Sequence, residues 1–224
     1  MKSYIVLPFV QRRPIPEKFH DDDNRSIESL VEYFLHYFSK PGDTVFDPFA
    51  GLGTTLLAAE DIGRIPFGIE ADEERVEYVR SMIKNKDNIL LGDSRRLDEF
   101  QIPEVDFVYT SPIFMGCDET MNPLSGFKEP GTYVVYLDDI QSIFSKMRKF
   151  LKPSAKIVVD VYNLQATDTR PMTLLAWDMA RSISKVLKFE KEIVVCWQEG
   201  EIVRSDSPQK NGYDHSYCLV FSSE

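Results

Sequence analysis

Residues 47–55 read DPFAGLGTT and place two glycines, Gly51 and Gly53, where an apolar strand turns into a helix. Glycine permits both a tight turn and the close approach of a ligand to the backbone. The next predicted strand ends in Glu70, the position at which a doubly wound fold places a carboxylate that binds ribose hydroxyls. The spacing favours a nucleoside-containing ligand, and a simple tight turn remains the alternative.

Two aspartates indicate which kind of nucleoside-containing ligand is favoured. The glycine turn lacks the lysine of a phosphate-binding GxxxxGK loop, and Asp47 at its start would repel a pyrophosphate. A cationic cofactor without phosphate fits these residues better. Asp93 follows a later strand and is placed to accept a hydrogen bond from an adenine amino group, although it could instead cap the next turn.

The elements that must position these residues alternate along the chain. Helical spacing of apolar residues predicts helices over 26–38, 56–63, 71–85, 136–151 and 172–187. After a first strand-like patch, apolar runs predict seven strands, at 44–47, 65–70, 88–92, 105–112, 155–162, 192–198 and 216–222. The order predicts a mostly parallel sheet with helices on both faces, and an antiparallel last strand at or near one edge. Trp177 and Trp197 fall within these patterns, so core packing is the default for both.

The segment KPGDTVFDPFAGLGTTLLAAEDIGRIPFGIEADEE, residues 40–74, resembles the cofactor-binding segment of the DNA amino-methyltransferases that act on cytosine N4 or adenine N6. The resemblance implies a Rossmann-like class I methyltransferase domain that uses S-adenosyl-L-methionine. It implies that Glu70 holds the ribose and that Asp93 lies near the adenine. The other residues that it assigns to the cofactor site are Asp47, Pro48, Phe49, Gly51, Gly53, Thr54 and Ser94.

A second motif, DFVYTSPIF at 106–114, resembles the catalytic motif of the same family, a serine or aspartate followed by two prolines and an aromatic residue. An exocyclic amine is a poor nucleophile because its lone pair is delocalised into the ring. The Ser111 hydroxyl and the Pro112 carbonyl could each accept a hydrogen from the amine, while Phe114 stacks on the base. Ile113 departs from the motif, since a second proline is expected there.

In an open α/β sheet, ligands bind at the carboxyl ends of strands, near the switch in strand order. The strand before the glycine turn and the strand before Ser111 would lie side by side at that point, so cofactor and substrate would meet. A base in a duplex cannot reach such a pocket and must be flipped out or already unpaired. An ordinary strand end closed by Pro112 is the alternative reading of the second motif.

Composition limits the possible partners. At 224 residues, one domain over 1–224 is expected, with a segment covering the cofactor at 1–40, a cofactor-binding half at 41–100 and a catalytic half at 101–224. The net charge of −10 argues against binding nucleic acid through bulk electrostatics. Arg12, Arg13, Lys18 and Arg25 form either a local basic patch or plain solvated charges. The three widely spaced cysteines indicate neither a disulfide framework nor a zinc site, with buried free thiols as the default.

The chain is expected to be cytoplasmic, with no membrane span and no metal. The resemblance implies an enzyme that transfers a methyl group to a base amine, and the likeness of Ser111 to the family motif favours cytosine N4 in DNA. Few residues follow the catalytic strand that could read a DNA sequence. An RNA base methyltransferase, and a cofactor-binding protein without catalysis, are the alternatives.

Overall fold

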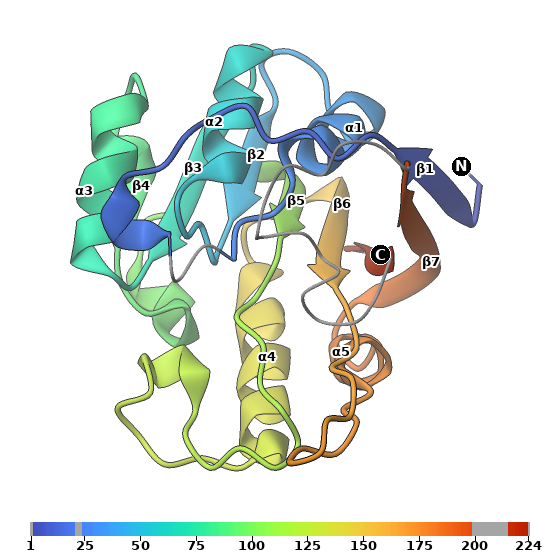
Figure 1. The fold of residues 1–224 in the computed structure, drawn as a ribbon. Coiled ribbons are helices and arrows are strands. Elements are labelled where there is room, and N and C mark those ends of the chain that lie inside the picture. The colour runs from blue at the N-terminus through green and yellow to red at the C-terminus, as the bar shows by residue number, and fades with distance from the viewer. Residues whose placement is uncertain (1, 21–23, 199–214, 224) are drawn as a thin grey trace.

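The computed structural model describes residues 2–20, 24–198 and 215–223, and these form an eight-stranded sheet with helices on both faces (Figure 1). The strands are β1 (Tyr4–Leu7), β2 (Thr44–Asp47), β3 (Ile65–Glu70), β4 (Ile89–Leu91), β5 (Val105–Thr110), β6 (Leu151–Val161), β7 (Lys188–Trp197) and β8 (His215–Ser222). Their order across the sheet is β1-β7-β8-β6-β5-β2-β3-β4.

Five α-helices cover the sheet, and their apolar faces decide which side each one takes. They are α1 (Glu28–Phe38), α2 (Thr54–Asp61), α3 (Glu73–Met82), α4 (Tyr133–Met147) and α5 (Leu175–Ile183). Short 3-10 helices are η1 (Glu17–Phe19), η2 (Lys86–Asn88), η3 (Ser94–Glu99) and η4 (Pro123–Ser125). Buried residues of α1, α2 and α3 pack on one face of the sheet, and those of α4 and α5 pack on the other.

The sheet differs from the predicted one in strand number and in the position of its last strand. The predicted seven strands are joined by β1, which pairs in parallel with β7 at the edge of the sheet. Strand β8 is antiparallel, as expected, but it lies between β6 and β7 and pairs with both. The other paired strands run parallel. The carboxyl ends of β2, β5 and β6 therefore share one edge.

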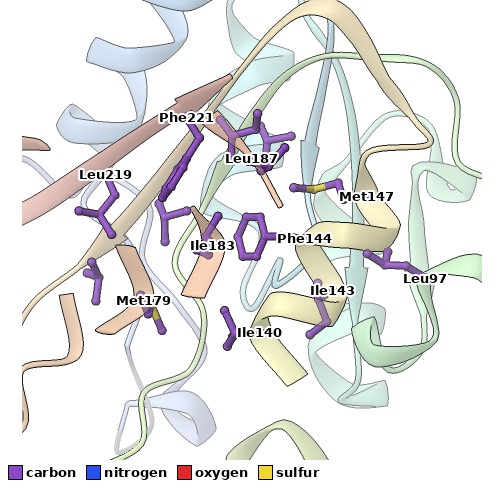
Figure 2. Close-up of a cluster of buried hydrophobic side chains, with 14 of the residues drawn as sticks. Leu97, Ile140, Ile143, Phe144, Met147, Met179, Ile183, Leu187, Leu219 and Phe221 are labelled. Atoms are coloured by element: carbon purple, nitrogen blue, oxygen red, sulfur yellow. The ribbon is translucent and has the colours of Figure 1, made fainter. Parts of the chain in front are cut away.

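The larger core cluster lies between the sheet and helices α4 and α5. Figure 2 shows Phe144 of α4 close to Ile183 of α5, with Phe221 of β8 nearby, and all three are fully buried. Burying side chains of this size contributes roughly 1.5–3 kcal/mol each. The core thus fixes α4 and α5 against β6 and β8, and β6 is the neighbour of β5 in the sheet.

A buried glutamate anchors the N-terminal segment. Glu28, whose side chain is 1% exposed, accepts a hydrogen bond from the Arg13 backbone N–H at 2.8 Å and forms ion pairs with Arg12 and Arg13. Beyond it, the Tyr78 hydroxyl of α3 donates to the Pro14 carbonyl at 3.2 Å. The segment therefore crosses from α1 over α2 to α3, as Figure 1 shows in dark blue.

Two predicted burials are wrong. Trp177 was expected in the core, yet it is 41% exposed, and its ring lies against the half-buried Tyr217 of β8 with ring centroids 5.2 Å apart. The three cysteines are free, as expected, but Cys117 is exposed instead of buried. Trp197 is half-buried at the end of β7. Of the helices in the described ranges, none is long and apolar enough to cross a membrane.

Replacing Glu28 by alanine should lower the free energy of unfolding by about 2 kcal/mol, because the Arg13 backbone N–H loses its acceptor and the half-buried Arg13 guanidinium loses one of its two carboxylate partners. Chemical denaturation at pH 7 measures this loss. Glu32→Ala is the matched control: Glu32 holds Arg12 at 2.6 Å from a more exposed position, so its loss should cost about 1 kcal/mol or less. Equal effects would contradict the anchoring role of Glu28.

Candidate active site

The two strand ends predicted to carry cofactor and catalysis meet. Strands β2 and β5 are parallel neighbours, with Val45 opposite Phe107 and Phe46 opposite Val108. At their carboxyl ends, the Thr110 hydroxyl donates a hydrogen bond to Asp47 Oδ1 at 2.7 Å. The glycine turn that follows Asp47 and the motif that begins at Ser111 therefore start from adjacent positions on one edge of the sheet.

Asp47 is a buried carboxylate with its own set of donors. Its side chain is 4% exposed and also accepts from the Phe49 backbone N–H at 3.0 Å. Burial raises the pKa of Asp47 to about 6, although hydrogen bonds from Thr110, Thr55 and Phe49 lower it, and the charge of Glu70 raises it further. At neutral pH this edge therefore holds a desolvated negative charge, which favours a cation nearby.

The glycine turn is built on two left-handed residues. Gly51, at φ +53°, donates its N–H to Glu70 Oε2 at 2.8 Å, and the other Glu70 oxygen accepts from the Asp72 N–H at 2.9 Å. Gly53, at φ +79°, is the N-cap of α2, and a Cβ there would lie 2.8 Å from Val79 Cγ2. The turn is thus tightly packed against α3, and it fixes the Glu70 carboxylate beside Gly51.

The end of β4 completes this side of the site. The Gly92 N–H donates to the Glu70 carbonyl at 2.9 Å, which brings the following residues next to the turn. Asp93 caps η3 through the Arg95 N–H at 2.8 Å and also pairs with the Arg95 guanidinium at 2.7 Å. The capping role is therefore present, and a contact between Asp93 and adenine remains a prediction. The buried Ser94 hydroxyl donates to the Pro48 carbonyl.

Ser111 is oriented by the neighbouring strand. Its hydroxyl donates to the backbone carbonyl of Asp160, the penultimate residue of β6, at 3.0 Å. Since a carbonyl oxygen can only accept, the hydroxyl proton is directed to β6, and the oxygen keeps its lone pairs for another donor. Pro112 is buried, and the half-buried Phe114 packs edge to face on Tyr162 with ring centroids 4.6 Å apart.

Ile113 occupies the place where the motif expects a second proline. Its side chain is 42% exposed, so it does not fill the core. Its carbonyl accepts a hydrogen bond from the hydroxyl of the fully buried Tyr136 of α4 at 2.9 Å. The backbone after Pro112 is therefore held by a side chain from α4, at the residue where a proline ring would have restricted it.

The structure brings in residues that the sequence did not single out. Besides Tyr136 and Tyr162, the Asp160 carboxylate accepts from the Tyr109 hydroxyl at 3.2 Å, and burial raises the pKa of Asp160 to about 6 while that hydrogen bond lowers it. An acidic residue at the end of the apolar run IVVDV was the available signal for Asp160. No comparable signal marked the tyrosines, because tyrosines in strands and helices are ordinary core residues.

The basic residues near the N-terminus do not form an open patch. Arg12 pairs with Glu32, Arg13 with Asp61 and Lys18 with Glu74, while Arg25 donates to the Arg13 carbonyl. Across the site, Arg95 bridges Asp93 and Glu129. The pairing leaves no open basic patch, while Arg12 and Lys18, whose side chains are 54% exposed, remain solvated as the second reading expected. Within the described part of the chain, no group of three or more potential ligands could hold a metal ion.

With this geometry in place, the fold defines a class of protein. The structure is similar over 95% of its length to TrmN from Thermus thermophilus, with a TM-score of 0.59, 19% identity and 54% of that chain covered. It is similar over 92% of its length to a TehB-like SAM-dependent methyltransferase from Corynebacterium glutamicum, with a TM-score of 0.56, 13% identity and 93% of that chain covered. The chain therefore has the fold of the S-adenosylmethionine-dependent methyltransferases.

The sequence narrows this class over one segment. Residues 26–81 match the model of the family described as DNA methylase. The Type II methyltransferase M2.DpnII from Streptococcus pneumoniae is 37% identical over 57 residues, which are 25% of this chain and 21% of that protein. The match thus reaches about a fifth of the length of this relative. The resemblance of the glycine-turn segment to the DNA amino-methyltransferases is confirmed over these residues.

Replacing Gly53 by alanine should destabilise the protein by two separate effects. The left-handed backbone disfavours any Cβ by about 1–2 kcal/mol, and the clash with Val79 adds to this loss. Gly42→Ala is the matched control, since Gly42 has φ +86° but open space where a Cβ would project, with no other atom within 4 Å. Thermal unfolding should show a larger loss of stability for Gly53→Ala than for Gly42→Ala. Equal losses would mean that Val79 of α3 moves aside at no cost in stability.

Proposed function

We propose that the protein is an S-adenosyl-L-methionine-dependent methyltransferase that methylates an exocyclic amine of a nucleic-acid base. The observation that carries the proposal is the junction of the two strand ends, in which Thr110 donates to Asp47 while the adjacent Ser111 donates to the Asp160 carbonyl and keeps its lone pairs for another donor. Cytosine N4 in DNA is the favoured target, because residues 26–81 match the DNA methylase family and serine stands at position 111.

The cofactor side fits a sulfonium nucleoside. A buried carboxylate at Asp47 and a second one at Glu70 attract a cation and hydroxyl donors, and the turn from Gly51 to Thr54 offers no lysine to a pyrophosphate. We expect Asp47, Pro48, Phe49, Gly51, Gly53 and Thr54 to line the methionine end and Glu70, Asp93 and Ser94 the adenosine end. Bound there, the cofactor supplies an electrophilic methyl group.

The residues on the substrate side make the exocyclic amine of the base a better nucleophile. The Ser111 oxygen and the Pro112 carbonyl accept hydrogen bonds from the two amine hydrogens, which localises the nitrogen lone pair toward the methyl group. Phe114, braced by Tyr162, stacks on the base and excludes water. With a cofactor bound, methyl transfer would join the amine nitrogen to the methyl carbon and leave the electron pair of the C–S bond on sulfur, and the proton lost from the amine would pass to solvent as the product leaves. Alignment of amine and methyl group supplies much of the rate.

The remaining parts of the chain have supporting roles in this proposal. Residues 1–40 cover the cofactor half, 41–100, since this segment reaches α3 through Lys18 with Glu74 and through Phe19, whose ring lies 5.8 Å from that of Tyr78. Residues 101–224 hold the substrate. The hydrogen bond from Tyr136 to the Ile113 carbonyl favours catalysis over a binding-only role, because it restrains the backbone where the proline is missing.

Ser111→Ala should reduce kcat about 100-fold or more, since an acceptor aimed at the reacting amine is lost, while cofactor affinity stays unchanged. The assay uses labelled cofactor with DNA, RNA and free nucleosides, followed by nucleoside analysis of the product. Ser154→Ala, at the exposed opposite end of β6, is the control and should behave as the unmodified protein. Full activity of Ser111→Ala would refute the catalytic assignment, and a labelled RNA product with unlabelled DNA would establish the RNA alternative.

Cofactor affinity should rise as the pH increases through about 6, because Asp47 attracts the cationic cofactor only when ionised and its pKa is raised to about 6. Titration calorimetry between pH 5 and 8 measures the dependence. Asp47→Asn removes the charge, so its affinity should be lower at pH 8 and nearly constant across this range. Since Asp160 also titrates near pH 6, a pH dependence that survives in Asp47→Asn would assign it to another group.

A further inference from the structure

Aromatic rings that the proposed mechanism does not use gather beside the catalytic strand end. Trp177 of α5 lies against Tyr217 of β8 with ring centroids 5.2 Å apart, and Tyr217 lies 5.1 Å from the ring of His215. Trp177 is 41% exposed, and Tyr217 and His215 are half-buried. We name these three residues the rim aromatics. Two further exposed apolar side chains, Met172 and Leu174, precede Trp177.

The strand register places Tyr217 two strands away from the strand that leads to Ser111, at the same edge of the sheet. The Ser111 hydroxyl reaches the Asp160 carbonyl of β6, and the next residue of β6, Val161, lies opposite Tyr217 in the antiparallel pair with β8. Neighbouring strands are about 4.8 Å apart. Tyr217 therefore lies one strand beyond the residue that orients Ser111, and Trp177 packs on the ring of Tyr217. Figure 1 shows α5 just past the arrowhead of β6.

Hydrogen bonds fix the backbone that carries Trp177. Its N–H donates to the Leu174 carbonyl at 3.1 Å in the first turn of α5, and the N–H of the preceding residue, Ala176, donates to the buried Asn163 side chain at 2.9 Å. On the following residue, Asp178 accepts from the Tyr133 hydroxyl of α4 at 3.0 Å. An aromatic ring that is carried on a fixed backbone and packed on Tyr217 has less conformational entropy to lose when a ligand stacks on it.

The charges around the site disfavour binding of nucleic acid through contacts with its phosphates. The cations Arg13, Lys18 and Arg95 are paired with carboxylates, and Arg170, in the segment before α5, pairs with Glu119 at 3.0 Å. Duplex binding draws most of its affinity from unpaired lysine and arginine on phosphates. Stacking of a base on an aromatic side chain needs no such charge and does need an unpaired base.

We propose that the substrate is a stretch of unpaired nucleic acid, and that Trp177 binds the nucleotide next to the target by stacking on its base. This inference rests on the proposed function. An unpaired target also avoids the unstacking and unpairing that a duplex base requires before it reaches Ser111 and Phe114. Bases of DNA and of RNA can both stack on an aromatic ring, so the test includes substrates of both kinds to distinguish them.

The test compares methyl transfer to four substrates of one sequence, the DNA and RNA single strands and their duplexes. We expect at least a 10-fold higher kcat/KM on a single strand. Trp177→Ala should raise KM for that strand roughly 10-fold, in the range found for the loss of one base stack, with kcat at saturation and cofactor affinity unchanged. Trp177→Phe should retain most of the affinity, since it keeps an aromatic face.

Phe189→Ala is the matched control. Phe189 is 36% exposed and lies 5.3 Å from Phe221, so it repeats the contact of Trp177 with Tyr217 at the opposite end of β8. Its loss should leave KM unchanged. Preference for the duplex, or equal KM values for Trp177→Ala and Phe189→Ala, would overturn the inference while methyl transfer itself stands. Absence of transfer to every substrate by the unmodified protein would instead overturn the proposed function.

Discussion

The hydrogen bond from Thr110 to Asp47 is the contact on which the site depends. It joins the ends of two parallel strands whose sequences are 63 residues apart, and it exists only because β5 crosses over to pair with β2. On one side the chain turns at once into the glycine loop and α2. On the other side it continues directly into Ser111. One buried contact thus sets the positions of both halves of the proposed reaction.

Burial determines the electrostatic properties of Asp47. A carboxylate removed from water is unfavourable unless donors or a cation compensate, and its three hydrogen bonds compensate only in part, as its raised pKa of about 6 shows. A bound cation would complete the compensation. The fold therefore maintains an electrostatic preference for a cation at Asp47, and the Gly51 N–H fixes the Glu70 carboxylate on the neighbouring glycine turn. The preference suits a sulfonium nucleoside better than a pyrophosphate.

The substrate side works by different forces. Arg170 on this side is engaged by Glu119, whereas rings at Phe114, Tyr162 and Trp177 remain partly exposed. Apolar faces of this kind recognise flat, uncharged partners at short range, and they gain little from long-range attraction. The proposed function and the proposed single-stranded substrate therefore both rest on a difference between the two halves of the site. Charged side chains mark the cofactor half, and aromatic side chains mark the substrate half.

The sequence by itself determined the local elements, the glycine turn and the two motifs. Left-handed backbone at Gly51 and Gly53, and apolar periodicity in the strands and helices, are encoded by neighbouring residues. It also predicted that β2 and β5 would be adjacent, because crossover rules constrain strand order. Tertiary structure decided the rest: the pairing of β1 with β7, the insertion of β8, the Tyr136 and Asp160 contacts, and the exposure of Trp177. Each depends on segments distant in sequence, whose contacts leave no periodic trace in either segment alone.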